Sequence, residues 1–133
     1  MNTTYFLNLV MGNLFRTKEN PTLPANYYLG LSSTTPTIDG VCTGEPSMNG
    51  TGYERILLNN LSEPLDGVIT NNDYIMFEES IAEWGNITHY VVYDAEKGGN
   101  LLFFGELSPS RYVEINTAVV IKPEALVLAL SNA

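Results

Sequence analysis

The sequence predicts an all-β fold, an antiparallel β-sandwich of the jelly-roll-like type with one N-terminal α-helix. Short segments rich in β-branched and aromatic residues recur along the chain and are separated by turns of Gly, Pro and Asn. The clearest turn, Gly98-Gly99-Asn100, lies between residues 86–93 and 100–107 and predicts a β-hairpin. Helical periodicity occurs only near the N-terminus. Successive strands without intervening helices indicate a sandwich or barrel rather than an alternating α/β fold.

Residues 3–17 are the helical candidate, and Thr3 or Thr4 is suited to cap the first turn. We expect the helix to pack either on its own domain or on a neighbouring subunit. The apolar residues recur at three- and four-residue spacing and so share one face, which we take as a candidate assembly interface: Phe6, Leu7, Val10, Met11, Leu14 and Phe15. Residues 18–26 contain two prolines and are expected to be a linker.

Residues 27–130 are expected to form the sandwich, and residues 1–133 a single domain, because the length suits one hydrophobic core. A helical turn is expected at residues 80–83, just before Trp84. Turns are expected at Asn71-Asn72 and at residues 122–125. The predicted strands, in order, are residues 27–32, 53–59, 65–70, 73–77, 86–93, 100–107, 111–115, 118–121 and 126–130.

Residues 34–52 form a long polar stretch that is rich in Gly, Pro, Ser and Thr. Compact domains rarely contain so long an irregular segment unless it has a use, and binding residues are often found on such loops. We therefore expect a surface loop that contacts a partner. Its candidate contact residues are Thr35, Pro36, Asp39, Gly40, Glu45 and Pro46.

The composition restricts the possible partners. Hydrophobic residues make up 44% and charged residues 16% of the chain, which is typical of a folded protein. The net charge of −9 comes from six basic and fifteen acidic residues, so a nucleic-acid partner or an anionic membrane surface is not expected. No apolar run approaches the roughly 20 residues that span a bilayer. No basic residue precedes the apolar N-terminal segment, so we expect no signal peptide.

The sequence contains no pattern that indicates catalysis. Glu78, Glu79 and Glu83 offer carboxylates of the kind a glycosidase uses, but in an acidic chain we expect them to form a solvated edge. His89 is the only histidine and Cys42 the only cysteine, so neither a two-histidine metal site nor a disulfide within the chain is possible. We expect no enzyme activity and no cofactor.

Two alternatives remain open for the polar segments. Oxygen ligands in loops suit calcium, and such residues occur in the long loop (Asp39, Gly40, Glu45) and around the hairpin turn (Asp94, Glu96, Asn100). No calcium-loop spacing is present, so no metal site is predicted. Aromatic residues near the hairpin form either core or a platform on which a sugar could stack. The candidates are Trp84, Tyr90, Tyr93, Phe103 and Phe104.

Four motifs occur in the order of a known family. They are YLGLSSTTPT at residues 28–37, GTGYER at 50–55, WGNITH at 84–89 and DAEKGGNLLF at 94–103. In these motifs the chain resembles small virion proteins of tailed bacteriophages that are usually labelled tail-fibre or minor structural proteins. The resemblance extends from the N-terminal helix to the last strand. It brings no catalytic residues with it.

The resemblance implies a structural component of a tailed-phage virion, made in the host cytoplasm, of the tail-fibre or tail/neck adaptor type. The expected partners are other virion proteins and further copies of the same chain. Capsid decoration, or a module that binds a host-surface glycan, is the alternative. The sequence lacks the heptads or collagen-like repeats of a fibrous shaft, so an adaptor or decorating knob is compatible with it. The position on the particle stays open between tail, neck and capsid.

Overall fold

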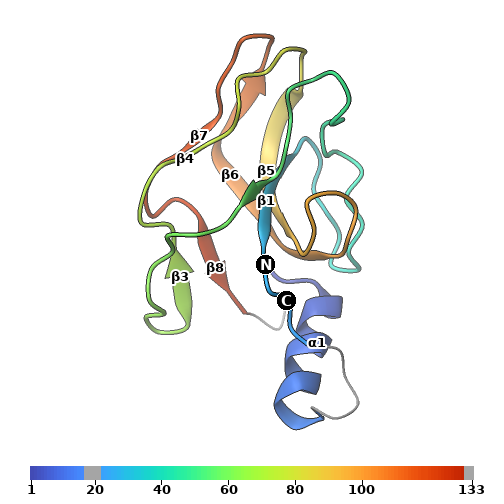
Figure 1. Cartoon of the computed structure of the whole chain (residues 1–133), viewed down its shortest axis with the longest axis vertical. Coiled ribbons are helices and arrows are strands. Elements are labelled where there is room, and N and C mark those ends of the chain that lie inside the picture. Colours follow the sequence, from blue (N-terminus) through green and yellow to red (C-terminus); the bar gives the residue numbers. More distant parts are fainter. Residues whose placement is uncertain (17–21, 131–133) are drawn as a thin grey trace.

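The computed structural model describes residues 1–16 and 22–130, and Figure 1 shows one helix beside a body built of strands. Each strand pairs antiparallel with its neighbours. The elements in chain order are α1 (Thr4–Phe15), β1 (Tyr28–Ser32), β2 (Ile56–Leu57), β3 (Val68–Thr70), β4 (Ile75–Met76), β5 (Gly85–Tyr93), β6 (Leu101–Val113), β7 (Val120–Ile121) and β8 (Val127–Ala129).

The main sheet has the strand order β2-β1-β5-β6, and the predicted hairpin forms its β5–β6 pair. Val92 of β5 lies opposite Phe103 of β6, and Tyr90 lies opposite Gly105. A side chain at Gly105 would collide with the Tyr90 ring, so this glycine leaves the space that the ring occupies. The Tyr90 hydroxyl donates to the Val127 carbonyl at 2.9 Å and thereby ties the sheet to β8.

Two short ribbons, β3–β8 and β4–β7, complete the β structure of the described residues. Their apolar side chains and those of the main sheet share one core, so the sandwich-like all-β fold with an N-terminal helix is confirmed. The buried residues of this core are Leu29, Leu31, Tyr53, Phe77, Trp84, Ile87, Tyr90, Val92, Val113, Val119, Ile121 and Leu126.

The strand bounds differ most from the prediction in two places, while β3, β4, β7 and β8 are each shorter than predicted. The strands predicted at residues 100–107 and 111–115 are one long strand, β6, which continues past Leu107 because its second half pairs with Gly85–Ile87 of β5. Pro109 is tolerated within it because β6 is an outer strand of the sheet, where a missing N–H leaves no partner unpaired. The strand predicted at residues 53–59 is reduced to Ile56–Leu57, the only residues there that pair with β1.

Residues 80–83 do not form the predicted helical turn. The N–H groups of Ser80 and Ile81 donate instead to the carbonyls of Thr117 and Thr51, at 2.9 and 3.0 Å. The Trp84 N–H, which would close such a turn on the Ser80 carbonyl, donates to the Val113 carbonyl at 2.9 Å, and the Ser80 carbonyl accepts from the Asn116 N–H at 2.7 Å. The bond that a helical turn over these residues needs is therefore not made. The segment therefore joins the loop after residue 50 to the loop before β7.

The helix α1 is fixed to the sheet by its N-cap residue, Thr3. The Thr3 hydroxyl accepts from the Phe6 N–H at 3.3 Å and donates to the Leu101 carbonyl at 2.7 Å, while the Thr3 N–H donates to the Leu102 carbonyl at 2.9 Å. The predicted threonine cap is thus confirmed at Thr3. Residue 17 of the predicted helix and residues 18–21 of the predicted linker lie outside the described residues, and residues 22–26 form neither helix nor strand.

Candidate assembly interface

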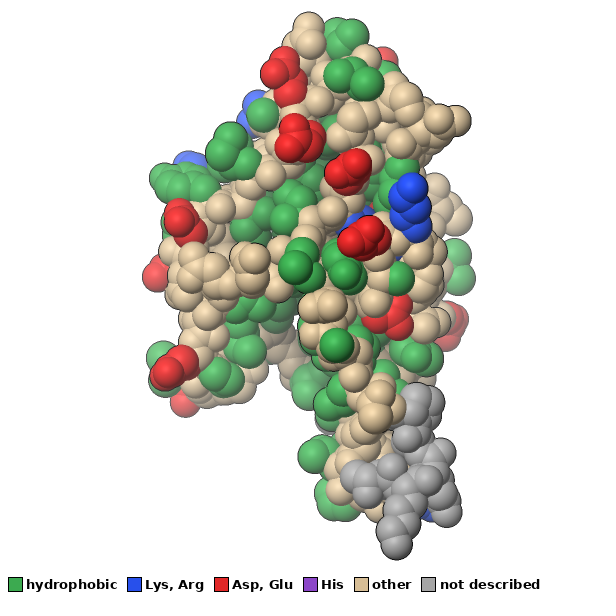
Figure 2. Space-filling view, in the orientation of Figure 1, with side chains coloured by type: hydrophobic (Ala, Val, Ile, Leu, Met, Phe, Trp, Pro, Cys, Tyr) green, Lys and Arg blue, Asp and Glu red, His purple; other side chains and the backbone are tan. Residues whose placement is uncertain are grey.

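The buried side chains of α1 lie in the first half of the helix, and its most exposed apolar side chains lie in the second half. Phe6 and Leu9 are buried in the first half, where the Phe6 ring lies 5.0 Å from the Phe103 ring of β6. In the second half Leu14 and Phe15 are 64% and 74% exposed. Figures 1 and 2 show this half of the helix projecting beyond the β-rich body. The helix therefore packs on its own chain at one end and presents apolar side chains to solvent at the other.

The six predicted interface residues are accordingly split. Phe6 is buried, Leu7 and Val10 are half-buried, and Met11 is 49% exposed like the two residues at the helix end. Leu9 was not predicted to lie on the packed face. The sheet does not contact the middle of the predicted apolar face of the helix but one side of it. Phe6 and Leu9 therefore pack with Leu102 of β6 in one buried cluster, and Met11 is not part of that cluster.

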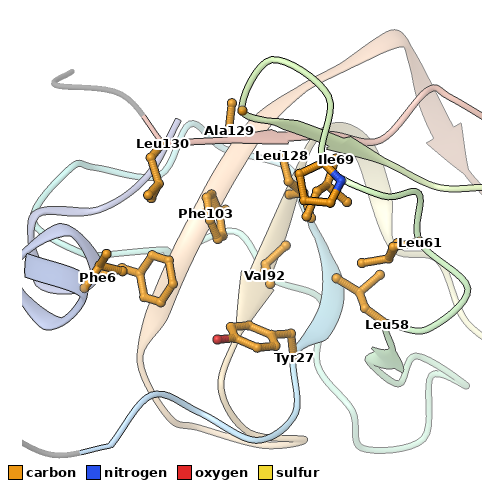
Figure 3. Close-up of a pocket in the computed structure, with 13 residues that line it drawn as sticks. Phe6, Tyr27, Leu58, Leu61, Ile69, Val92, Phe103, Leu128, Ala129 and Leu130 are labelled. Carbon is orange, nitrogen blue, oxygen red and sulfur yellow. The ribbon is translucent and has the colours of Figure 1, made fainter. Parts of the chain in front are cut away.

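A groove opens between α1 and the β3–β8 ribbon, with a volume of about 390 Å³. Phe6 and Val10 line it from the helix, Ile69 and Leu128 from the ribbon, and the pair Val92–Phe103 from the main sheet (Figure 3). None of the described residues that line it carries a charge. The lining side chains point toward one another from three separate elements, so only the folded chain creates this surface.

The loop of residues 34–52 folds back on itself and touches the start of α1. Ser33 donates from its N–H to the Gly44 carbonyl at 2.9 Å, and the Thr4 N–H donates to the Ile38 carbonyl at 3.0 Å. Of the predicted contact residues, Thr35 and Asp39 are exposed. Gly40 and Pro46 are half-buried, and Pro36 is buried.

Glu45, the sixth predicted contact residue, is used inside the fold. Its two carboxylate oxygens accept from the Arg55 Nε and Nη2 atoms at 2.7 Å each. The side chains of Arg55 and Glu45 are only 3% and 15% exposed. The guanidinium carbon also lies 3.6 Å from the centre of the Tyr93 ring at the end of β5. The Arg55 Nη1 group donates at 2.8 Å to the carbonyls of Ala95 and Gly98.

This arrangement gives Arg55 five contacts in three separate segments: the long loop, the end of β5 and the hairpin turn. An arginine paired at two positions with a carboxylate and stacked on an aromatic ring is held in one geometry. Sequence patterns did not single out Arg55, because its partners are 10 and about 40 residues away along the chain. Arg55 and Glu45 therefore hold the loop against the end of β5 and the hairpin turn.

Because of two tyrosines beside this ion pair, Tyr53 and Tyr93, we expect the folded protein to become less stable at alkaline pH. Burial, and then the Glu45 carboxylate, raise the pKa of Tyr53; burial, and then Cys42 and Glu45, raise the pKa of Tyr93. Because folding favours the protonated hydroxyls, their contribution is complete below the unfolded tyrosine pKa of about 10 and is lost as the pH rises above it. We expect the free energy of unfolding to fall by up to about 1.4 kcal/mol per pH unit for each tyrosine.

Urea unfolding of the wild type and of Tyr93→Phe at pH 8, 10 and 11 measures this effect. The phenylalanine keeps the ring under Arg55 and removes only the titrating hydroxyl, so the decline above pH 10 should be less steep in the variant. Parallel declines in the two proteins would show that Tyr93 does not titrate with folding.

The other polar residues singled out in the sequence form no reactive cluster. Glu78, Glu79 and Glu83 are exposed. His89 is buried, and its Nδ1 atom lies 2.7 Å from the Thr88 hydroxyl. Asp94 accepts from the Asn100 backbone N–H at 2.7 Å and from its side-chain amide at 3.1 Å, so it closes the hairpin turn.

The described residues contain neither a metal-binding cluster nor a helix that could cross a bilayer. In residues 1–16 and 22–130, no three His, Cys, Asp or Glu side chains are grouped as a metal site. Within the same ranges, α1 falls short of the length and apolarity that a bilayer span requires.

Comparison with known proteins identifies the family. The sequence model of one family, described as podophage GP4 fiber I protein gp80, matches residues 2–129. The chain belongs to this family. The resemblance to tailed-phage tail-fibre proteins is therefore confirmed, and the podophage fibre family places the chain among virion structural proteins. No curated protein matches the chain.

Proposed function

We propose that the chain is a structural component of a tailed-phage virion, of the tail-fibre or tail/neck adaptor type, that works by protein–protein assembly and not by catalysis. Membership of the podophage fibre family supports the fibre-type role. The exposed apolar end of α1 supports the mode of action, because such surfaces on soluble proteins commonly mark protein contacts. The proposed partners are other virion proteins and further copies of the chain.

The single observation that carries this proposal is the spacing of the exposed residues on α1. Met11, Leu14 and Phe15 stand at positions i, i+3 and i+4 of the helix and so form one patch. A helix that binds in a groove of its partner uses anchors at this spacing. Burying such side chains stabilises a contact by about 1.5–3 kcal/mol for each one that is fully covered.

The charge distribution supports a contact made by apolar packing. Residues 4–15 contain no acidic or basic side chain, although the whole chain carries a net charge of −9. In Figure 2 the acidic side chains lie over the β-rich body and none is visible on the projecting helix. The end of α1 can therefore approach another acidic protein without strong repulsion.

The test is incorporation of the protein into particles. A phage lacking this protein is complemented with the wild type or with the combined change Met11→Gln, Leu14→Gln and Phe15→Gln. We expect the variant to remain folded, because its three altered side chains are exposed, but to be incorporated at least about tenfold less well. Quantitative immunoblotting of purified particles measures incorporation, and circular dichroism checks the fold.

The matched control is the loop change Thr35→Ala with Asp39→Ala, which also alters exposed residues. It should leave incorporation at the wild-type level. If the helix variant entered particles as well as the wild type, α1 would not be the assembly contact. If the loop variant entered particles that then failed to adsorb to cells, the loop would be assigned to a host-surface contact instead.

A further inference from the structure

The apolar groove between α1 and the β3–β8 ribbon has the character of a protein-binding surface. Its volume of about 390 Å³ is within the range of about 300–1,000 Å³ in which small-molecule sites fall. Such sites, however, contain a few polar groups that orient the ligand. Among the described residues, the side chains that line this groove are apolar apart from the hydroxyl of Tyr27. Apolar side chains of a protein, which need no polar anchor, fit the lining better.

The chain itself carries a matching set of side chains. Phe6 and Val10 of α1 line the groove, and Leu14 continues the same stripe one turn further along the helix. Groove and helix end are thus two parts of one continuous apolar surface. A second copy presents both parts as well, so one contact between copies covers the helix end of one chain and the groove of the other.

Charge also favours a second copy as the occupant. Two chains that each carry a net charge of −9 repel each other over most of their surfaces. The residues of α1 from Thr4 to Phe15 are uncharged, and so are the groove residues within the part of the chain that the structure describes. These two surfaces are therefore places where identical acidic chains can meet without burying a charge, which would be costly.

We infer that the groove binds the exposed end of α1 from a second copy of the chain, with Leu14 and Phe15 inserted between the helix and the β3–β8 ribbon. This inference rests on the proposed assembly function and specifies the site at which copies meet. The helix end of one copy is the part that inserts, and the groove of the other copy receives it.

Cross-linking between two differently labelled variants tests the inference directly. In a Cys42→Ser background, which removes the only native thiol, one protein carries Leu14→Cys and the other Ala129→Cys in the groove. A short bismaleimide is added to the mixture. We expect heterodimers at several-fold higher yield than with Ser110→Cys, a control on the exposed part of β6 outside the groove.

A groove-filling change provides a second, independent measurement. Ala129→Phe places a ring in the groove and should weaken self-association at least about tenfold by analytical ultracentrifugation, while thermal unfolding shows whether the chain is still folded. Self-association at wild-type strength in Ala129→Phe, or equal cross-linking at Ser110→Cys, would overturn the inference. So would capture of another virion protein by Ala129→Cys in assembled particles. Each of these results leaves the proposed function standing if the protein still enters particles through α1.

Discussion

Replacing Arg55 by methionine is expected to destabilise the folded protein by about 3–5 kcal/mol, the usual effect of removing one partner of a buried ion pair. The side chain of Glu45 is only 15% exposed and would keep a negative charge with little access to water. Two carbonyl groups of the hairpin turn would also lose a charged donor. Chemical denaturation at neutral pH measures the change.

The expected pattern among related variants distinguishes a broken ion pair from lost packing. Glu45→Leu combined with Arg55→Met should recover part of the stability lost in Arg55→Met alone, because it removes the unpaired carboxylate. A purely additive double variant would mean that the charges are not coupled. Lys97→Met, which removes a cation from an exposed position in the same hairpin turn, is the control and should change stability by less than about 0.5 kcal/mol.

Replacing Asn71 by alanine is expected to cost at least about 2–3 kcal/mol, since buried polar groups would be left without partners. Asn71 is 1% exposed, and its amide donates to the carbonyls of Asp73 and Lys122 at 2.8 Å. Its side-chain oxygen accepts from the Leu126 N–H at 3.0 Å. The residue thus joins the segment between β3 and β4 to the segment between β7 and β8.

The neighbouring residue supplies a matched control. Asn72 is exposed, and its side chain makes only a 3.4 Å bond to Asn60, so Asn72→Ala should change stability by less than about 0.5 kcal/mol. Because β3–β8 forms one wall of the groove, Asn71→Ala should also reduce self-association. Equal stability of the two alanine variants in urea would contradict the role assigned to Asn71.

The fold was predictable where local patterns and tertiary structure agree. The hairpin of β5 and β6 combines a Gly-Gly-Asn turn with apolar arms, and Thr3 is a good N-cap before an apolar helix, so both follow from short-range preferences. Residues 80–83 were mispredicted because the Trp84 N–H and the Ser80 carbonyl, which would close a helical turn, bond instead to Val113 and Asn116, far away along the chain. The length of β6 was mispredicted because it depends on pairing with the first residues of β5.

The sequence could not tell which of the six predicted helix residues are exposed, because exposure also depends on contacts with distant segments of the chain. Helical spacing correctly grouped Met11, Leu14 and Phe15 on one apolar face, but the pattern of apolar residues does not say which turn of a helix a sheet covers. The structure shows that Phe6 and Leu9 near the start of the helix are buried, whereas Leu14 and Phe15 at its end are exposed. The groove could not be predicted, since α1 and β3–β8 come together only through the sheet between them.

The sequence by itself determined the class of fold, the helix with its threonine cap, the central hairpin and the resemblance to phage fibre proteins. These depend on neighbouring residues or on the order of motifs, which are read directly along the chain. Tertiary structure alone decided that Glu45 pairs with Arg55, that Asn71 joins two turns, and that half of α1 stays exposed beside an apolar groove. Each of these depends on contacts between segments distant in sequence, and burial and hydrogen bonding there are properties of the folded chain.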